Sequence, residues 1–328
     1  MFIVFVKPNK MALKKVPMNI FEDIEKIKKP FDNAVVTIGN FDGVHLGHQT
    51  LFNKVLEKAG EINGTSIAIT FEPHPIKVLK KNGGPPLITL YEQKTELILN
   101  SGIDVLICIP FTKEFSSLTA MDFIENLLVN RIGMKAIVIG EDYTFGKNRE
   151  GDINLLKKCA PRLGFEVIVA HLITPESKKM SDKISSTIIR ELVIGGHVEK
   201  AENMLGRYYQ IRGRVIKGRD RGGKLLGIPT ANIVLSDELC PKIGVYAVYV
   251  ECRGNKYKGV ANIGYSPTFD DHIFTVEVHL LDFNENIYDE KIRVNFVKRL
   301  RGEKKFSGID ELSSQIRKDI ERARTIIT

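Results

Sequence analysis

The sequence predicts an α/β protein of two domains, a parallel-sheet domain followed by a small antiparallel β-barrel. Three observations support this fold class. The chain has 328 residues, and single domains commonly have about 100–150. Through the first two-thirds, short apolar runs alternate with segments of helical length, which is the pattern of parallel strands joined by crossover helices. After Gly206, strand-like runs dominate.

The first domain is predicted to contain five buried strands. Each is a short run rich in β-branched and other apolar residues, and helical segments separate them. The expected strands are residues 34–39, 65–71, 103–109, 135–140 and 165–172, and the expected helices are residues 46–60, 91–101, 119–130, 152–163 and 185–205. Ligands of such sheets bind beyond the carboxyl ends of the strands, so the loops there should carry the functional residues.

The second domain is predicted to be an antiparallel sheet or barrel closed by one helix. The runs YQIRGRVI, GVYAVYVEC, KYKGVANIG and FTVEVHLLDF are separated by turns that contain Gly and Pro, and residues 309–325 have an amphipathic pattern. The expected domains are therefore residues 1–206 and 207–328. We assign no function to residues 1–30.

Composition excludes several classes of protein. No apolar stretch approaches the roughly 20 residues that a transmembrane helix needs. The opening MFIVFV is short and lacks a cleavage site, so it is a poor signal peptide. The four cysteines show no CxxC spacing, which favours reduced thiols. We expect a cytoplasmic protein without a membrane partner.

The net charge of +8 is unevenly placed. Residues 207–328 carry 22 Lys and Arg against 16 Asp and Glu, a balance of +6, and residues 207–224 alone hold seven of these bases. Such a segment could attract nucleic acid, an anionic membrane or a polyphosphate ligand, or it could be a solvated basic surface. Charge alone does not decide between these.

The segment GNFDGVHLGHQ (39–49) predicts an anion site where a strand turns into a helix. Its glycines allow a tight turn and close approach of a ligand to the helix N-terminus, whose N–H groups attract phosphate. His45 and His48 are three residues apart, so they share a face and can donate hydrogen bonds to a triphosphate.

Two other interpretations of the histidines stay open at this point. One His could cap the turn while the other packs on the surface. Alternatively, both could bind zinc, with Asp42 as a weak candidate for a third ligand. The string GxxxxGK[ST] is absent from the sequence, so a Walker-type phosphate loop is excluded.

A second helix start could also bind phosphate. KISSTIIR (183–190) places three hydroxyl side chains between Lys183 and Arg190, immediately before or within a predicted helix. The hydroxyls could serve as N-caps or as phosphate ligands.

Two further candidate functional motifs of the first domain lie in loops that follow predicted strands. TFEPHP (70–75) carries His74 between two prolines, and GEDYTFG (140–146) carries Tyr143 and Phe145. These aromatic side chains could face a planar ring or pack locally.

Together the four motifs resemble the adenylyltransferase half of the bacterial bifunctional riboflavin kinase/FAD synthetase family, a Rossmann-like nucleotidyltransferase. The resemblance implies that FMN attacks the α-phosphorus of ATP, giving FAD and pyrophosphate, with His45 and His48 at the phosphates and His74 and Phe145 near the flavin. Many relatives have Asn at the position of Asp142. The implied ATP-binding residues are Gly39, Asn40, Asp42, Gly47, Asp142, Ser186, Thr187 and Arg190.

A second phosphate site is predicted in GRVIKGRDRGGKLLGIPTANI (213–233). Its glycines and basic residues could wrap phosphates, or could form a hairpin. Thr230 and Asn232 are two apart in an extended segment, so both offer hard oxygen ligands on one side, as Mg²⁺ requires.

Alternation in TVEVHLLDF (275–283) places Glu277 on the face opposite Val276 and Val278. Glu277 is therefore either exposed to solvent or a carboxylate that accepts a proton from an alcohol during phosphoryl transfer.

The second half resembles the riboflavin kinase domain of the same family through LGIPTANI, GVYAVYV, GVANIGYSPTF, VEVHLLDFNENIYDE and RLRGEKKF. The resemblance implies a six-stranded barrel that holds Mg-ATP, with Glu277 as the base for the ribityl hydroxyl of riboflavin. Relatives commonly have Arg at the position of Lys224. The implied ATP-binding residues are Gly213, Gly218, Lys224, Thr230 and Asn232, the last two being the Mg²⁺ ligands.

The sequence thus predicts a transferase that phosphorylates riboflavin in its second domain and adenylylates FMN in its first, with small molecules as its partners. Phosphate binding accounts for the basic segment without nucleic acid. Two alternatives remain: that only one site is active, with Asp142 and Lys224 as suspects, or that the chain is a nucleic-acid-binding protein on the same scaffold.

Overall fold

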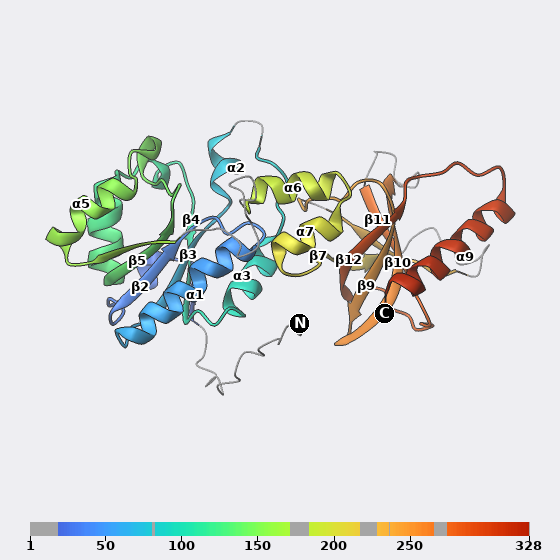
Figure 1. Cartoon of the computed structure of the whole chain (residues 1–328), viewed down its shortest axis with the longest axis horizontal. Helices are drawn as coiled ribbons and strands as arrows, with labels where there is room; N and C mark the ends of the chain where they lie inside the picture. Colours follow the sequence, from blue (N-terminus) through green and yellow to red (C-terminus); the bar gives the residue numbers. More distant parts are fainter. Residues whose placement is uncertain are drawn as a thin grey trace, which may run out of the picture. The chain divides into compact units, whose positions relative to one another are not determined.

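The computed structural model describes residues 19–80, 83–170, 184–216, 228–235, 237–265 and 274–327. These residues form two compact units (Figure 1). The first consists of the described residues of Met1–Asn40, Thr50–Gly83 and Thr95–His171, and the second of those of Phe41–Gln49, Gly84–Lys94 and Leu172–Thr328. Two short excursions of the N-terminal half are therefore grouped with the C-terminal part of the chain. A functional boundary near Gly206 stays a prediction.

The first unit contains a six-stranded sheet in which every pair of neighbours is parallel. All five expected strands are present. The sixth, β1, was not predicted: it has only three residues and pairs with β4 at the edge of the sheet. In the sheet order β1-β4-β3-β2-β5-β6, the strands are Asn19–Phe21, Val105–Pro110, Ser66–Glu72, Ala34–Ile38, Met134–Gly140 and Glu166–Ala170.

The order of the strands places next to each other the ends of two strands, β2 and β5, that precede predicted motifs. From β2 the chain continues to β3 and β4 on one side of the sheet, and later to β5 and β6 on the other. The carboxyl ends of β2 and β5 are therefore adjacent at the point where the strand order reverses, which is where α/β sheets bind ligands. Gly39 and Asn40 leave β2 there, and the GEDYTFG loop leaves β5.

Apolar side chains of the strands and of several helices form the core of the first unit. β2 is buried along its whole length because it lies inside the sheet. The predicted helix 119–130 consists of a short α4 that continues as the π-helix η3, whose Ile124 and Leu128 join the core. The helices up to β6 are η1 Ile24–Lys26, α1 Leu46–Glu61, α2 Pro75–Leu79, α3 Tyr91–Leu99, η2 Phe115–Ser117, α4 Ala120–Asp122, η3 Phe123–Ile132, η4 Lys147–Arg149 and α5 Ile153–Leu163.

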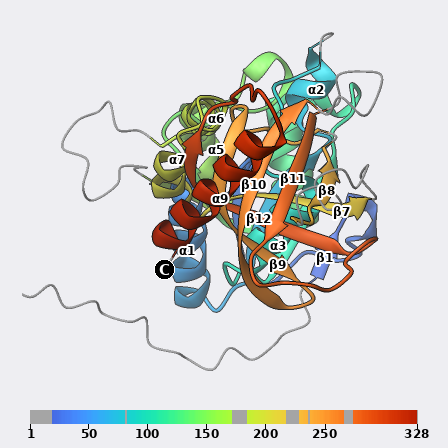
Figure 2. The same cartoon turned by 90° about the vertical axis from the view of Figure 1, so that its right-hand side faces the viewer.

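The second unit contains a closed antiparallel barrel of six strands, as the resemblance implied (Figure 2). Alternate side chains point inward: Val276, Val278 and Leu280 of β11 are buried, as the alternation predicted. In barrel order the strands are β10 Asn255–Tyr265, β11 Phe274–Leu280, β8 Ala231–Val234, β7 Tyr209–Ile216, β12 Lys291–Arg301 and β9 Gly244–Cys252.

Within the described residues, the helices α7 and α9 pack against the barrel, and α6 packs against α7. The expected helix 185–205 is two helices, α6 Ser186–Ile194 and α7 Val198–Leu205, because the pair Gly195–Gly196 ends α6 and Gly196 has a φ of +81°. α7 contacts β7 and β12, and α9 (Ile309–Ile326) contacts β9, β10 and β12.

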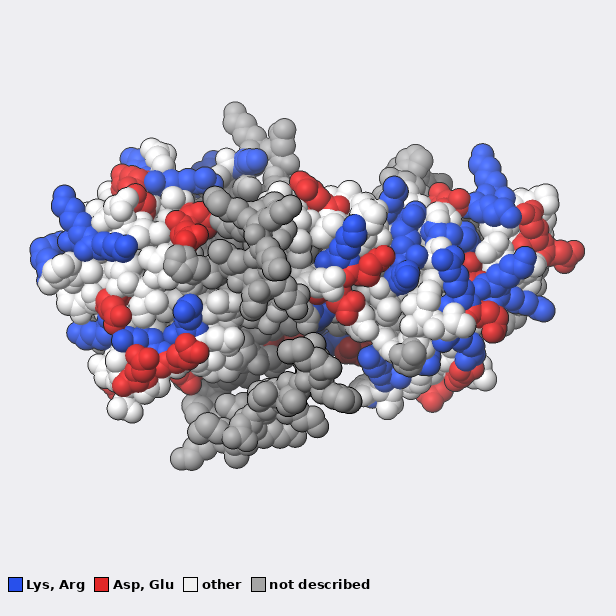
Figure 3. Space-filling view, viewed as in Figure 1, with Lys and Arg blue, Asp and Glu red and all other residues white. Residues whose placement is uncertain are grey.

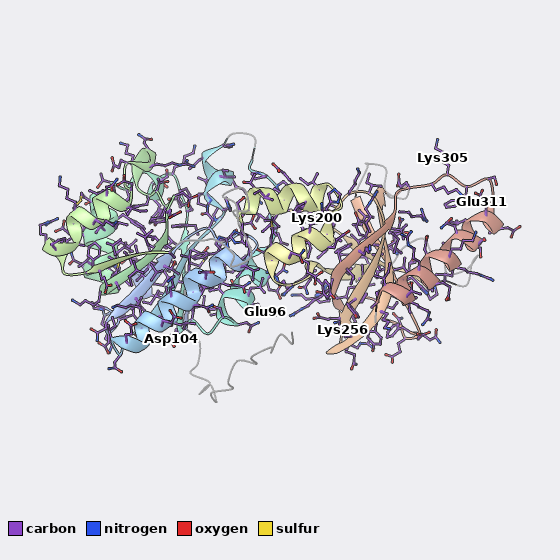
Figure 4. The ribbon with its side chains drawn as sticks, in the orientation of Figure 1. Glu96, Asp104, Lys200, Lys256, Lys305 and Glu311 are labelled. Atoms are coloured by element: carbon purple, nitrogen blue, oxygen red, sulfur yellow. The ribbon has the colours of Figure 1, made fainter. Side chains whose placement is uncertain are left out.

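The start of α9 is fixed by a carboxylate. Glu311 lies in the first turn of α9 (Figure 4). It accepts hydrogen bonds from the backbone N–H and the hydroxyl of Ser307 and pairs with Lys304 at 2.9 Å. These donors lower the pKa of Glu311 to about 2, so the capping interaction persists across the neutral range.

Candidate active sites

The turn between β2 and α1 has an unusual backbone. Phe41, Gly43 and Val44 have φ values of +48°, +85° and +40°. A positive φ is costly for a β-branched residue such as Val44, so the turn persists only where neighbouring groups hold it. Gly43 donates its N–H to the Thr89 hydroxyl at 3.0 Å, and a Cβ at Gly43 would lie 3.2 Å from Ile88. Strained turns of this kind cluster at functional sites.

His45 and His48 lie against each other at the start of α1. Their rings stack with centroids 3.6 Å apart, and Nδ1 of His45 accepts a hydrogen bond from the backbone N–H of His48 at 3.3 Å. His45 therefore caps the helix, which agrees with the interpretation that one of the two histidines caps the turn. Because Nδ1 is an acceptor, the ring proton of neutral His45 is on Nε2, where it can be donated to a ligand.

Both imidazoles are neutral at pH 7. Burial, followed by the charge of Arg207, lowers the pKa of His45 to about 4. Burial, then His45 and Arg207, holds the pKa of His48 well below its usual value. The buried Nδ1 of His48 has no hydrogen-bond partner among the described residues, so this ring can still accept or donate a hydrogen bond toward a ligand.

Asp42 joins three segments that are distant in the sequence. Its carboxylate accepts hydrogen bonds from the backbone N–H groups of Ile88 and Thr89 at 3.0 and 3.1 Å. It also pairs with Arg190 of α6 at 2.8 Å, and both side chains are largely buried. The Ser186 hydroxyl donates to the backbone carbonyl of Asp42 at 2.8 Å. Asp42 thus connects α6 to the turn that carries His45 and His48, which we call the HxGH turn (residues 41–48). Its carboxylate is already engaged by these donors, which weakens its case as a zinc ligand.

The hydroxyl side chains at the start of α6 have different surroundings. Ser185 is the N-cap, with its Oγ accepting from the N–H of Ile188 at 3.3 Å. Ser186 faces the HxGH turn, and Thr187 is exposed. The structure thus brings His45, His48, Asp42, Ser186 and Arg190 into one region of the second unit, while an ATP contact for each remains a prediction.

Breaking the Asp42–Arg190 pair is expected to destabilise the second unit. Asp42→Ala leaves the Arg190 charge and two backbone N–H groups buried without their acceptor, which typically costs about 3 kcal/mol in the free energy of unfolding. A loss of this size should lower the thermal unfolding midpoint, measured by calorimetry, by about 5–10 °C.

The matched control for this variant is Glu25→Ala. Glu25 also pairs with an arginine, Arg131, at 3.1 Å, but its side chain is 75% exposed, so its loss should change the stability by no more than about 0.5 kcal/mol. Equal midpoints for the two variants would contradict the structural role of Asp42.

In the first unit, the predicted flavin residues have local packing roles. His74 is the N-cap of α2, and its Nδ1 accepts from the N–H of Ile76 at 3.2 Å. Phe145 is 8% exposed and lies between the rings of Tyr143 and Phe123, each 5.5 Å away. Asp142 and Asn40 are exposed.

The rings beyond Phe145 form a continuous apolar wall. Neighbouring centroids are 5.5 to 6.3 Å apart from Phe145 through Phe123, Phe115 and Phe111 to Phe71. Phe71 and Phe111 stand at the ends of β3 and β4, so the wall lies at the carboxyl edge of the sheet. Aromatic edges and faces of this kind can pack against a planar ring.

Glu277 lies in the middle of a polar row on the outside of the barrel. In the strand registers it is directly opposite Asn232 of β8 and Asn262 of β10. Burial raises the pKa of Glu277, and a hydrogen bond from the side chain of Asn262 partly offsets this effect. The carboxylate is therefore half-buried, flanked by amides and more basic than an exposed glutamate, as a proton acceptor should be.

The residues beside this row were only partly predicted. Asn262 was not singled out, because its position opposite Glu277 follows from strand register and not from sequence spacing. His279 lies two residues after Glu277 in β11 and therefore on the same face of the strand. Its Nδ1 donates to the backbone carbonyl of Pro229 at 2.8 Å, which fixes the chain next to Thr230.

A cavity of about 360 Å³ lies next to Thr230. Its lining is apolar where β7, β8 and β11 contribute, and mixed apolar and polar where the segment after β11 contributes. The volume is within the range of about 300–1,000 Å³ that small-molecule sites occupy. The lining residues are Val215, Pro229, Thr230, Ala231, Val278, Leu280, Phe283, Asn284, Glu285, Asn286, Ile287 and Tyr288.

The glycine-rich segment is only partly described. Gly218 and Lys224 lie outside the described residues. Gly213 lies within β7, where a Cβ would be 2.1 Å from a methyl group of Ile233, so the close packing of the barrel requires glycine there. Its contact with ATP stays a prediction. Figure 3 shows Lys and Arg side chains over the barrel and α9, in keeping with the positive balance of residues 207–328.

The fold and the two family activities it can support define a class of protein: a transferase that combines a nucleotidyltransferase-type parallel sheet with a kinase-type barrel. A family model for FAD synthetase matches residues 27–188, and one for riboflavin kinase matches residues 205–327. The chain belongs to the bifunctional riboflavin kinase/FMN adenylyltransferase family.

Its relatives match over nearly their full lengths. The bifunctional riboflavin kinase/FMN adenylyltransferase of Buchnera aphidicola (subsp. Schizaphis graminum) is 41% identical over 307 residues, 93% of this chain and 97% of the relative. That of Escherichia coli K12 is 36% identical, with 94% and 97% covered. That of Listeria monocytogenes is 39% identical, with 89% and 92% covered.

A solved structure has the same fold. A crystal structure described as a macrolide-efflux protein from Streptococcus pneumoniae is 33% identical, with a TM-score of 0.83 over 94% of this chain and 99% of that chain. Within the ranges that the structure describes, every helix is too short or too polar to cross a lipid bilayer.

Proposed function

We propose that the two family activities are divided near Gly206, with riboflavin phosphorylated at the barrel and FMN adenylylated at the HxGH turn. The observation that carries the proposal is the pairing of two chemically different sites in one chain. One has a half-buried carboxylate between two amides, and the other has two neutral histidines at a helix start.

At the barrel, Glu277 accepts the proton of the terminal ribityl hydroxyl of riboflavin. The hydroxyl oxygen forms a bond to the γ-phosphorus of ATP while the bond between that phosphorus and the ADP oxygen breaks, which gives FMN and ADP. The adjacent cavity accommodates the isoalloxazine ring. Thr230 lines this cavity and is two residues from Asn232, so it stands where the flavin chain would meet the polar row.

The donor set beside Glu277 fits Mg²⁺. The oxygens of Thr230 and Asn232 are hard ligands, and magnesium commonly needs few protein ligands because phosphates and water complete its shell. Thr230 and Asn232 would hold the ion, which when bound neutralises charge on the ATP phosphates.

At the HxGH turn, a phosphate oxygen of FMN forms a bond to the α-phosphorus of ATP, and the bond from that phosphorus to the pyrophosphate oxygen breaks. This reaction requires positioning and stabilisation of negative charge, and no covalent intermediate on the protein. His45 can supply an Nε2–H donor, and Ser186 and Arg190 stand beside the same turn. The aromatic wall of the first unit supports a flavin position at the carboxyl edge of its sheet.

Product analysis tests the proposal. Purified full-length protein incubated with riboflavin, ATP and Mg²⁺ should form FMN first and FAD afterwards, and FMN with ATP should give FAD and pyrophosphate. Chelation of Mg²⁺ with EDTA should stop riboflavin phosphorylation, and excess Mg²⁺ should restore it.

Chromatography of the flavins separates the alternatives. FMN without FAD would mean that only the barrel is active and would direct attention to Asp142. FAD from FMN without phosphorylation of riboflavin would direct attention to Lys224. If the protein forms neither FMN nor FAD, the proposal is contradicted.

The four cysteines are all free, which supports a reducing, cytoplasmic setting for both reactions.

A further inference from the structure

The chain segment that leads from α7 into β7 contacts the HxGH turn. Gly206 ends α7 with a φ of +70°, and a Cβ there would lie 2.6 Å from the Leu46 side chain. The next residue, Arg207, is half-buried. Arg207 is one of the seven basic residues of the segment 207–224, and the riboflavin kinase family model, which matches residues 205–327, includes it.

The Arg207 guanidinium holds the backbone of the strained turn. Its Nη2 donates to the carbonyl of Gly43 at 2.6 Å, and its Nη1 donates to the carbonyls of Val44 and Leu205 at 3.2 and 3.3 Å. Gln49 adds a second connection, since its Nε2 donates to the same carbonyls of Val44 and Leu205 at 3.1 and 3.2 Å.

These contacts restrain the turn at the residues that most need restraint. Gly43 and Val44 both have positive φ, and they directly precede His45. On one side of the turn, the Gly43 N–H donates to the Thr89 hydroxyl, and the Asp42 carboxylate accepts from the N–H groups of residues 88 and 89. Arg207 holds the carbonyl side. If the contacts of Arg207, or those of Asp42 and Thr89, are removed, the strained backbone can relax and the two histidines lose their fixed positions.

We propose that Arg207 is a positioning residue for FMN adenylylation: it fixes the carbonyls of Gly43 and Val44 so that His45 and His48 stand correctly at the ATP phosphates. The inference rests on the proposed role of those histidines. It means that the half of the chain matched to riboflavin kinase supplies a side chain on which the other reaction depends.

The charge of Arg207 has a second effect on the same site. Arg207 is the charged group that acts on both histidines, and His45 also acts on His48; burial and Arg207 both favour the neutral rings. The pKa of Arg207 itself is lowered to about 10 by burial and by Arg212, so Arg207 remains charged at pH 7. Protonation of His45 would place a proton on Nδ1, which now accepts from His48, and would release the helix cap.

The test compares both reactions in single full-length variants. Arg207→Ala should lower kcat for FMN adenylylation by about 10- to 100-fold, as expected for misplaced reacting groups. Riboflavin phosphorylation by the same sample should stay within about twofold, because within the described residues the hydrogen bonds of Arg207 go to Gly43, Val44 and Leu205 and not to the Glu277 row. Arg207→Lys should be intermediate, since an ammonium keeps the charge but lacks the planar fork that reaches two carbonyls.

Two further readouts separate positioning from general stability. Added guanidinium ion should restore part of the adenylylation by Arg207→Ala, and the acid limb of its pH–rate profile should move to higher pH because the histidine pKa values rise without the nearby cation. The matched control is Arg293→Ala, on the same barrel, whose side chain is 40% exposed and 3.9 Å from Glu251; it should leave both reactions unchanged.

Three results would overturn the proposal: unchanged adenylylation in Arg207→Ala, an equal loss of both reactions, or a loss that guanidinium does not relieve and that leaves the acid limb in place. If the unaltered protein converts no FMN to FAD, the proposed function fails instead, and the product analysis above detects that separately.

Discussion

Glu277→Gln is expected to lower riboflavin phosphorylation by about 10²- to 10⁴-fold, the range that a general base typically contributes. Glutamine has almost the same shape and can keep the hydrogen bond to Asn262, but it cannot accept the proton of the ribityl hydroxyl. The measurement is the initial rate of FMN formation from riboflavin, with saturating ATP and Mg²⁺.

The same variant carries its own folding control, because conversion of FMN to FAD should proceed at the unaltered rate. Glu251→Gln is the matched substitution: Glu251 is another partly exposed barrel glutamate, and its side chain accepts from Asn295 at 3.0 Å. It should leave both reactions within about twofold, as surface substitutions usually do. Near-normal phosphorylation by Glu277→Gln would exclude Glu277 as the base.

The pH dependence gives an independent check on Glu277. A base must be deprotonated to act, and burial raises the pKa of this carboxyl. The acid limb of the phosphorylation rate should therefore lie above the usual titration range of glutamate. Asn262→Ala removes the hydrogen bond that favours the carboxylate, so it should move that limb to still higher pH, whereas the acid limb of adenylylation should not move.

His48→Ala is expected to lower FMN adenylylation by about 10²- to 10³-fold, the loss seen when one preorganised donor to a developing negative charge is removed. Riboflavin phosphorylation should continue, so FMN should accumulate in a reaction that begins with riboflavin. The measurement is the rate of FAD and pyrophosphate formation from FMN and ATP.

Two substitutions of His45 separate the role of Nδ1, which caps the helix, from that of Nε2, which can donate to a ligand. In His45→Asn, the amide oxygen can take the place of Nδ1 and keep the cap to the N–H of His48, but the Nε2–H donor is lost. In His45→Gln, an amide N–H can reach the position of Nε2. Lower adenylylation by the Asn variant than by the Gln variant would support the donor role; the opposite order would mean that capping dominates.

Sequence patterns predicted the regular elements well because burial imposes a simple periodicity on them. The five long parallel strands are nearly continuous apolar runs, and each was found. β1 was missed because it is a three-residue edge strand whose Ile20 is 42% exposed, so it has no apolar run to detect. The break at Gly195–Gly196 was missed because both flanking segments are helical in pattern.

The site was predicted where its residues are close in sequence. The spacing of three residues in a helix predicts that His45 and His48 share a face. The spacing of two residues in a strand predicts the same for Thr230 and Asn232. Arg207 and Asn262 could not be found in this way. Arg207 meets Gly43 across 164 residues, and Asn262 meets Glu277 through strand register, so both contacts exist only once the chain has folded.

The grouping of the chain into two units has a consequence for biosynthesis. Residues 41–49 and 84–94 emerge early from the ribosome, but they belong to the unit that is completed by the last third of the chain. At a synthesis rate of about 5–20 residues per second, Arg190 and Arg207 are synthesised many seconds after the HxGH turn, and the barrel strands are synthesised later still. The parallel sheet can therefore form on the nascent chain while the HxGH turn is still incomplete. The site proposed for adenylylation is then completed together with the barrel that is proposed to supply its FMN.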